Sequence, residues 1–163
     1  LNIVCNDSFF EFSDFEINKY LGQKTISYTI NTLKYFKKKT GSTLLFILGT
    51  DAFSTINSWY KWNEILSYCH LVLIERGGEK SDIEIMPIEV REFFKDNITN
   101  DINDLKNKNH GTIYPISMPV FKESSSEIRD RSMKNLDIKN FLPKTIQDYI
   151  NHNGLYKLPG HNK

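Results

Sequence analysis

Two short runs of consecutive apolar residues constrain the fold of this chain more than any other feature. They are LLFIL at residues 44–48, followed directly by Gly49, and LVLI at residues 71–74, which ends shortly before Gly77 and Gly78. Apolar runs of this length are typical of strands buried on both faces, and such strands occur mainly in parallel sheets that are covered by helices. We therefore predict an α/β fold built on a parallel sheet.

A helical signal lies before the first of these runs. Residues 26–41 carry apolar side chains at helical spacing, with Thr25 or Ser27 as a candidate N-cap. Three lysines near the end of this stretch suit the C-terminal end of a helix dipole, and Gly41 is a stop signal. We expect one helix here.

The remaining segments complete the predicted order of elements. We predict helices over residues 51–67, with a break near Asn57, over residues 82–94, from Ser124 and after Pro143. We predict a loosely alternating strand over residues 9–17, a short strand over residues 111–116 and a polar surface excursion over residues 95–110. Alternating strands and helices without an internal repeat are typical of a single α/β domain.

Composition and charge exclude several classes of function. A net charge of +1 over 163 residues gives no general attraction to nucleic acid. Cys5 and Cys69 lie far apart in the sequence, which indicates reduced thiols in a cytoplasmic protein. No apolar run reaches membrane-spanning length, and the first residues do not resemble a signal peptide. The histidines lack ligand spacing, so we predict no metal site built from protein ligands.

Polar residues and glycines follow the predicted strands. Gly49 and Asp51 come after the first strand, Glu75 and Arg76 after the second, and the SSSEIRDR stretch that begins at Ser124 after the third. Ligands of open parallel sheets gather beyond the carboxyl ends of the strands. Glycines allow close approach of the backbone, aspartate accepts from ribose hydroxyls, and arginine binds phosphate oxygens. Together these residues predict a nucleotide site.

Each of these residues also has a purely structural interpretation. Ser124 with Glu127 forms a capping-box pattern that needs no ligand, although a helix N-terminus is also an anion site. Asp51 suits the start of a helix without any ligand. Trp59 and Tyr60 could belong to the core, as large aromatic residues usually do.

Four segments, in the same order, resemble bacterial nicotinate-nucleotide adenylyltransferases. They are ISYTINTL, LFILGTDAFSTINSWYKWNEILSYCHLVLIERGG, SSSEIRDR and LPKTIQDYINHNGLY. They match the family's S-Y-T-x-x-T-L block, its G-x-D and W-[YF] region, its I-S-[SA]-T-x-I-R motif and its C-terminal helix. The resemblance covers residues 1–156. It implies a Rossmann-like open parallel sheet with helices on both faces.

The resemblance also implies roles on the substrate side. Tyr28 and Thr29 match the pair beside the pyridine nucleotide, and Trp59 matches the tryptophan that stacks on the nicotinate ring. Tyr60 would present its backbone N–H to the nicotinate carboxylate. Arg76 matches an arginine near the substrate.

On the ATP side, the resemblance implies two groups. Gly49 and Asp51 match residues that line the adenosine site. Ser124, Ser125, Ser126 and Arg129 match the motif that holds the ATP phosphates at a helix N-terminus, with Arg129 stabilising the reacting phosphate.

The sequence departs from the family pattern in several places. Glu123 replaces an apolar residue, Ser126 a threonine and Gly77 a proline. The family signature G-G-x-F-D-P-x-H-x-G-H, which supplies histidines to the transferring phosphate, does not occur in residues 1–163. We therefore expect residues 1–163 to form one nucleotidyltransferase domain that is incomplete at its N-terminus, with the signature and the first strands upstream.

The reaction implied by the resemblance transfers the adenylyl group of ATP to nicotinate mononucleotide, giving deamido-NAD and pyrophosphate. Mg²⁺ would be held mainly by the ATP phosphates, and a homo-oligomer is left open. One alternative is a sister adenylyltransferase for phosphopantetheine or a flavin precursor, against which the Tyr28–Thr29 and Trp59–Tyr60 pairs argue. The other is a non-catalytic nucleotide-binding module, which an upstream H-x-G-H would exclude.

Overall fold

The computed structural model describes residues 10–23, 26–76, 86–119 and 124–156. The chain divides into two compact units, one of Asp14–Val120 and the other of Leu1–Ser13 with Phe121–Lys163. The prediction of one domain over residues 1–163 stays a prediction. Within the described ranges, no helix is long and apolar enough to cross a membrane.

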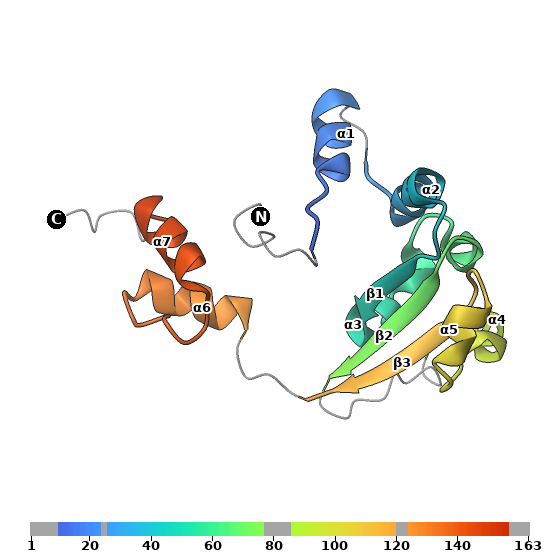
Figure 1. The fold of residues 1–163 in the computed structure, drawn as a ribbon. Helices are drawn as coiled ribbons and strands as arrows, with labels where there is room; N and C mark the ends of the chain where they lie inside the picture. Colours follow the sequence, from blue (N-terminus) through green and yellow to red (C-terminus); the bar gives the residue numbers. More distant parts are fainter. Residues whose placement is uncertain (1–9, 24–25, 77–85, 120–123, 157–163) are drawn as a thin grey trace. The chain divides into compact units, whose positions relative to one another are not determined.

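The larger unit is built around a parallel sheet, which has three strands among the described residues (Figure 1). The strands are β1 (Leu45–Gly49), β2 (His70–Arg76) and β3 (Ile113–Met118), in the order β1-β2-β3. Leu45 is paired with His70, and Leu71 with Ile113, so the carboxyl ends of all three strands lie at one edge. The predicted open parallel α/β sheet is confirmed.

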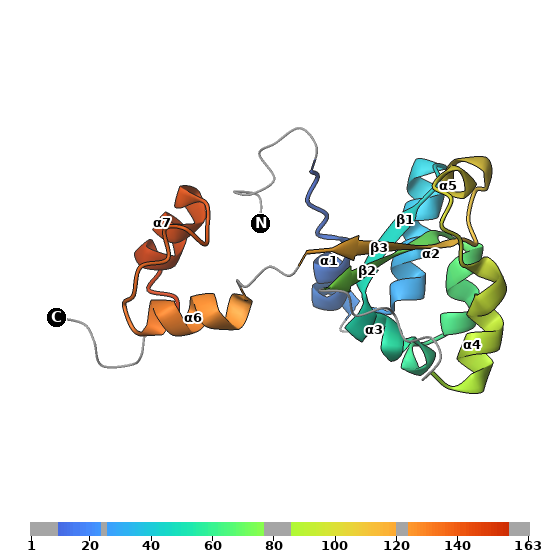
Figure 2. The same cartoon turned by 90° about the horizontal axis from the view of Figure 1, so that it is seen from below.

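One face of the sheet packs on short helices. Helices α3 (Thr50–Ser54) and α4 (Ile88–Phe94) lie on the same side of the sheet (Figure 2). Their Phe53 and Phe94 are fully buried, with ring centroids 5.2 Å apart. Burying one such side chain contributes roughly 1.5–3 kcal/mol, so this face holds the main core of the unit.

The opposite face of β1 is exposed among the described residues. Leu48 is buried, but Leu45 and Ile47 are 52% and 64% exposed. Successive side chains of a strand point to opposite faces, so these two share the face away from the core. The prediction that residues 44–48 are buried on both faces is therefore wrong for this strand. Among the described residues, the half of the apolar run that faces away from the core is not covered by another element.

Helix α2 (Thr29–Thr40) precedes β1 and buries Ile30 and Leu33. Its N-cap residue is Tyr28, which makes no side-chain capping bond, so the candidate Ser27 is not the cap. The other candidate, Thr25, lies outside the described residues. The predicted stop is confirmed, because Gly41 has φ 65° and its N–H donates to the carbonyl of Lys37. Only glycine adopts this left-handed conformation without cost.

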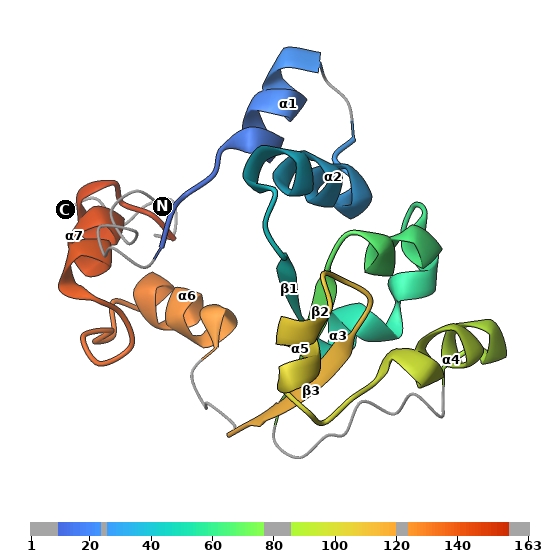
Figure 3. The ribbon, with the colours of Figure 1, turned by 45° about the vertical axis from the view of Figure 1, so that its right-hand side comes forward.

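Helix α1 (Phe15–Gln23) replaces part of the strand predicted over residues 9–17. The ring of Phe15 stacks on that of Tyr35 in α2, with centroids 3.8 Å apart, so the two helices pack together (Figure 3). The loose alternation of aromatic residues was misleading because this partner lies far away in the sequence.

The predicted helix over residues 51–67 is divided, as expected from the break near Asn57. After α3, the chain forms short 3₁₀ helices at Ile56–Ser58 and Trp62–Ser67. The hydroxyl of Ser58 donates to the carbonyl of Thr55 at 2.7 Å. Such local bonds compete with the α-helical pattern and favour a break.

Residues 95–110 form a polar excursion with structure of its own. It contains a 3₁₀ turn at Lys95–Asn97, which follows directly on α4, and helix α5 (Asn103–Asn107). Ile98 makes an isolated parallel bridge with Ile113, so the excursion also touches the sheet. The described part of the helix predicted over residues 82–94 is α4, and residues 82–85 lie outside the described ranges.

The smaller unit contains helices α6 (Ser125–Met133) and α7 (Lys144–His152), which confirm the helices predicted from Ser124 and after Pro143. Arg131 contacts the loop between these two helices at two points. Its Nε donates to the carbonyl of Asp137 at 2.9 Å, and its guanidinium lies 4.7 Å from the centroid of the Phe141 ring. The connection is therefore held by contacts within this unit.

Candidate functional site

Gly49 and Asp51 lie at the carboxyl edge of the sheet. Gly49 ends β1 and is the N-cap of α3, and Asp51 lies exposed in the first turn of that helix. A Cβ added at Gly49 would lie 2.6 Å from Oδ1 of Asp51. The φ of Gly49 is −81°, which any residue adopts. A side chain at position 49 would therefore displace the exposed carboxylate of Asp51, whereas the backbone conformation itself does not demand glycine.

A second carboxylate lies at this edge, on β2. Glu75 is only 9% exposed and accepts a hydrogen bond of 3.2 Å from the hydroxyl of Ser117 on β3. The sequence placed Glu75 at a strand end but assigned it no role, because its partner is on another strand. Arg76 follows as the last residue of β2, and its side chain, like Gly77 and Gly78, lies outside the described residues.

The two segments that carry the predicted substrate-side residues meet through Tyr28 and Tyr60. The rings of Tyr28 and Tyr60 are in contact, with centroids 4.6 Å apart at a tilt of 38°. Thr29 follows Tyr28 as the first residue of α2, and Trp59 precedes Tyr60. Tyr60 is half-exposed, so this cluster is open to solvent on one side.

Trp59 joins the cluster to the core. Its side chain is partly buried and packs against the buried residues of the larger unit. Its ring meets the ring of Phe46 edge-on, with centroids 6.3 Å apart. The structural interpretation of Trp59 as core is thus partly correct, and it does not exclude contact with a ligand.

A cavity of about 500 Å³ lies beside this cluster, between α1, α2 and β1. Thr29 and Phe46 are among its lining residues, and so is Glu16 of α1. The Thr32 hydroxyl donates to the Glu16 carboxylate at 2.5 Å. The cavity is therefore mostly apolar, with one carboxylate at its wall.

An ion cluster supports the turn that follows Tyr60. Lys61 has φ 55°, and its ammonium lies 2.8 Å from the Glu64 carboxylate, which Lys34 of α2 also reaches at 2.9 Å. These two hydrogen bonds hold the pKa of the Glu64 carboxyl below its ordinary value. All three side chains are partly open to solvent, so we expect the cluster to position the turn more than it stabilises the fold.

The smaller unit carries the other predicted phosphate-binding residues. Ser124 is the N-cap of α6, and its Oγ accepts a 3.1 Å hydrogen bond from the backbone N–H of Glu127. The predicted N-cap is therefore confirmed. Ser125 and Ser126 are exposed in the first turn, and a guanidinium nitrogen of Arg129 donates to the Ser126 hydroxyl at 3.1 Å.

The two arginines of SSSEIRDR differ in their surroundings. Arg129 is exposed, and Ser126 of its own helix is its hydrogen-bond partner. Arg131 is half-buried and fastens the connection to α7. Arg129 thus keeps guanidinium donors open to solvent, and its role as a phosphate ligand stays a prediction. The packing role of Arg131 depends on Asp137 and Phe141, and the sequence does not reveal it.

The structure therefore groups the predicted residues into two sets. Gly49, Asp51 and the Tyr28–Tyr60 cluster belong to the larger unit, and Ser124–Arg129 to the smaller one. The predicted roles of all these residues stay predictions. Among the residues that the structure describes, no group of three or more His, Cys, Asp or Glu side chains could hold a metal ion.

Comparisons with known proteins give one family. A family model described as cytidylyltransferase-like matches residues 2–131. A probable nicotinate-nucleotide adenylyltransferase of Pectobacterium atrosepticum is 34% identical over 142 residues, which are 86% of this chain and 66% of that protein. A protein of the same description from Legionella pneumophila is 33% identical over 90% of this chain and 69% of its own length. The chain thus spans about two thirds of the length of these relatives.

Solved structures agree with the sequence relatives. Nicotinic acid mononucleotide adenylyltransferase of Plasmodium falciparum complexed with APC is 25% identical, with a TM-score of 0.57 over 95% of this chain and 71% of that chain. The same enzyme complexed with NaAD is 26% identical, with a TM-score of 0.50 over 80% of this chain and 58% of that chain. The resemblance indicated by the sequence motifs is confirmed.

Proposed function

Because the chain belongs to the cytidylyltransferase-like family, we propose that the protein transfers the adenylyl group of ATP to nicotinate mononucleotide, giving deamido-NAD and pyrophosphate. The observation that carries this proposal is the contact between Tyr28 and Tyr60, which brings two separate motif segments together beside Thr29 and Trp59. The descriptions of the relatives support the same reaction.

In this proposal, a phosphate oxygen of nicotinate mononucleotide attacks the α-phosphorus of ATP. The bond between the α-phosphorus and the bridging oxygen breaks, and pyrophosphate leaves. No covalent intermediate with the protein is needed, so catalysis consists of positioning the reactants and stabilising charge. Arg129 and the N-terminus of α6 would bind phosphate oxygens, since both present donors to solvent.

The remaining proposed roles concern the adenosine of ATP and the nicotinate ring of the mononucleotide. Gly49 and Asp51 would line the adenosine site. Trp59 would stack on the nicotinate ring, with Tyr28, Thr29 and Tyr60 around it and Arg76 near the substrate. Mg²⁺ would be held mainly by the phosphate oxygens of ATP. Such a bound ion would neutralise phosphate charge. We also propose that the protein works in the cytoplasm.

The substrate assignment predicts a preference for the acid mononucleotide over the amide. The backbone N–H groups of Thr29 and Tyr60 would pair with the nicotinate carboxylate but face another donor in the NH₂ of nicotinamide. A buried donor without an acceptor costs about 1–3 kcal/mol. We therefore expect the full-length protein to prefer nicotinate mononucleotide by about tenfold to a hundredfold in kcat/KM.

The measurement is pyrophosphate release with ATP, Mg²⁺ and each mononucleotide in turn, with phosphopantetheine as a third acceptor. Equal rates with acid and amide would contradict recognition of the carboxylate. Faster release with phosphopantetheine would favour a sister adenylyltransferase. Binding of ATP without release from any acceptor would favour a non-catalytic module.

The proposed adenosine site predicts the effect of Gly49→Ala. The added Cβ would lie 2.6 Å from Oδ1 of Asp51, so the carboxylate must turn away, while the backbone conformation remains allowed. Loss of a hydrogen bond to a charged group costs about 1.5–3 kcal/mol, so the KM for ATP should rise about tenfold or more. Gly41→Ala is the control: its φ of 65° should lower the melting temperature and leave this KM unchanged. An unchanged KM in Gly49→Ala would remove Asp51 from the site.

A further inference from the structure

The buried ring of His70 has a protonation state that its neighbours determine. His70 begins β2 and is 0% exposed. Its Nδ1 lies 3.1 Å from the backbone nitrogen of Thr112, and its Nε2 lies 3.0 Å from the carbonyl oxygen of Lys108. An amide N–H only donates and a carbonyl only accepts. Nδ1 is therefore the acceptor, Nε2 carries the hydrogen, and the ring is neutral.

This ring connects the start of β2 to the segment that leads into β3. The backbone N–H of His70 donates to the carbonyl of Leu44 beside β1, at 2.9 Å. On the other side, the N–H of Leu71 donates to the carbonyl of Thr112, and the N–H of Gly111 to the carbonyl of Cys69. The backbone N–H of Thr112 donates to Nδ1 of the His70 ring.

We propose that the His70 ring is an acid-sensitive clamp, which holds residues 108–112 at the amino edge of the sheet and releases them when it is protonated. Protonation adds a hydrogen at Nδ1, so the ring and the amide of Thr112 become two donors that face each other. The hydrogen bond then breaks and leaves a buried amide without an acceptor, which is unfavourable. Moving the segment away restores hydration to both groups.

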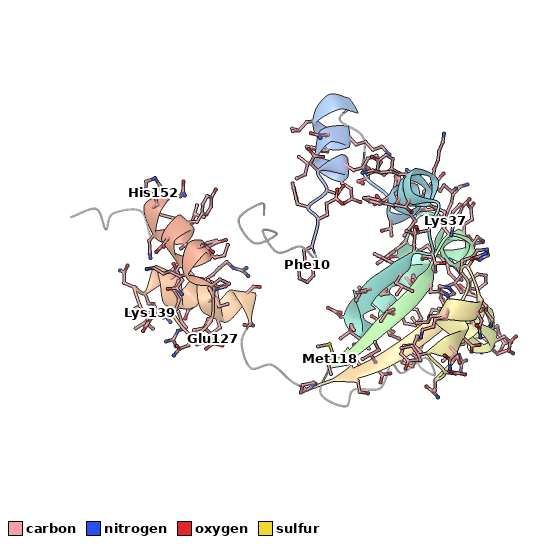
Figure 4. The ribbon with its side chains drawn as sticks, viewed as in Figure 1. Phe10, Lys37, Met118, Glu127, Lys139 and His152 are labelled. Carbon is pink, nitrogen blue, oxygen red and sulfur yellow. The ribbon has the colours of Figure 1, made fainter. Side chains whose placement is uncertain are left out.

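The surroundings of His70 disfavour its protonated form while residues 108–112 are in place. Lys37 of α2 lies at this end of the sheet, opposite to Met118 (Figure 4), and its ammonium reaches the carbonyl of Asn109. Burial lowers the pKa of His70, the hydrogen bond to the Lys108 carbonyl raises it, and electrostatic interactions with His110, Lys108 and Lys37 lower it further. Burial raises the pKa of the adjacent Cys69 thiol to about 12, so it stays neutral.

His110 is a built-in comparison for this clamp. Its Nδ1 lies 3.1 Å from the carbonyl oxygen of Leu66, so Nδ1 donates there. Protonation would add a hydrogen at Nε2 and leave this hydrogen bond in place. Of these two neighbouring histidines, only His70 therefore uses a ring nitrogen as an acceptor.

The clamp predicts the pH dependence of stability. The pKa of His70 is lowered in the folded state, so the unfolded chain, with an ordinary histidine pKa of ~6.5, takes up the proton first. The neutral ring makes its full contribution to the free energy of unfolding above about pH 6.5. This contribution is lost as the pH falls from there through the lowered pKa of the folded state. Over this window, the equilibrium constant for unfolding should rise by up to about tenfold for each unit by which the pH falls.

Denaturant unfolding of the full-length protein at several pH values tests this prediction. His70→Asn keeps an acceptor near Nδ1 and cannot be protonated, so its unfolding constant should lose this pH dependence, even if it is less stable throughout. His110→Asn is the matched control and should keep it. Equal pH dependence in the wild type and in both variants would overturn the proposal.

NMR of the wild-type protein is a second test of the proposal, and it does not depend on whether a variant folds. The ring nitrogens of His70 should show the Nε2–H tautomer at pH 7.5. The hydrogen-exchange protection factor of the Thr112 amide should then fall about tenfold or more as the His70 ring protonates. A protection factor that stays constant through this protonation, or an Nδ1–H tautomer at pH 7.5, would show that the ring is not a clamp.

Discussion

Replacing Arg129 with alanine is expected to lower kcat/KM of the full-length protein about a hundredfold or more, with little change in melting temperature. Arg129 is exposed, and its hydrogen-bond partner is a hydroxyl of its own helix, so the fold loses little when it is removed. A donor that stabilises charge in a transition state commonly contributes about 2.7–4 kcal/mol. Steady-state kinetics and thermal unfolding of the same preparation measure both effects.

Arg131→Ala is the matched control in the same helix. Its guanidinium holds the carbonyl of Asp137 and covers the ring of Phe141, so its loss should destabilise the smaller unit by about 1–2 kcal/mol. The kcat/KM of the folded protein should stay near the wild-type value. The opposite pattern, with Arg129→Ala unstable but active, would mean that Ser124–Arg129 is only a capped helix.

The second large effect is expected from Trp59→Ala. Trp59 is partly buried against the core and meets Phe46 edge-on, so its loss should lower the free energy of unfolding by up to about 3 kcal/mol. If Trp59 also stacks on the nicotinate ring, binding of nicotinate mononucleotide should weaken by a further 1–3 kcal/mol or so. ATP should bind nearly as before. Calorimetric titration with each substrate separates the two losses.

Trp62→Ala separates a ligand role from a packing role. The ring of Trp62 lies 5.2 Å from that of Phe93 and 5.8 Å from that of Phe94, on the core side. Its removal should cost a similar amount of stability and change the affinities for both substrates alike. If Trp59→Ala changes the affinities for both substrates alike, as expected for Trp62→Ala, Trp59 is only a core residue and does not stack on the nicotinate ring.

Local signals were sufficient where a structural feature depends on neighbours in the sequence. Gly41 ends α2 in a left-handed conformation, and Ser124 caps α6 through the amide of Glu127. Both features involve residues within about one helical turn, so the pattern of residue types predicts them. The break near Asn57 belongs to the same class, because nearby hydroxyls bond to nearby carbonyls.

The wrong predictions concern residues whose surroundings come from elsewhere in the chain. Residues 9–17 were expected to form a strand, but Phe15 begins helix α1, and its ring stacks on that of Tyr35 in α2. The run at residues 44–48 was expected to be buried on both faces, but apolarity does not reveal which elements cover a strand, and Leu45 and Ile47 are exposed among the described residues.

By itself, the sequence determined the parallel α/β class, the helix ends at Gly41 and Ser124, and the family, because short-range patterns and motif order carry that information. The tertiary structure alone decided which side chains share a surface. It placed Tyr28 against Tyr60, buried Glu75 beside Ser117, and gave Thr112 the ring of His70 as its acceptor. These contacts join segments that are distant in the sequence, and they form only when burial of the apolar face of the sheet brings those segments together.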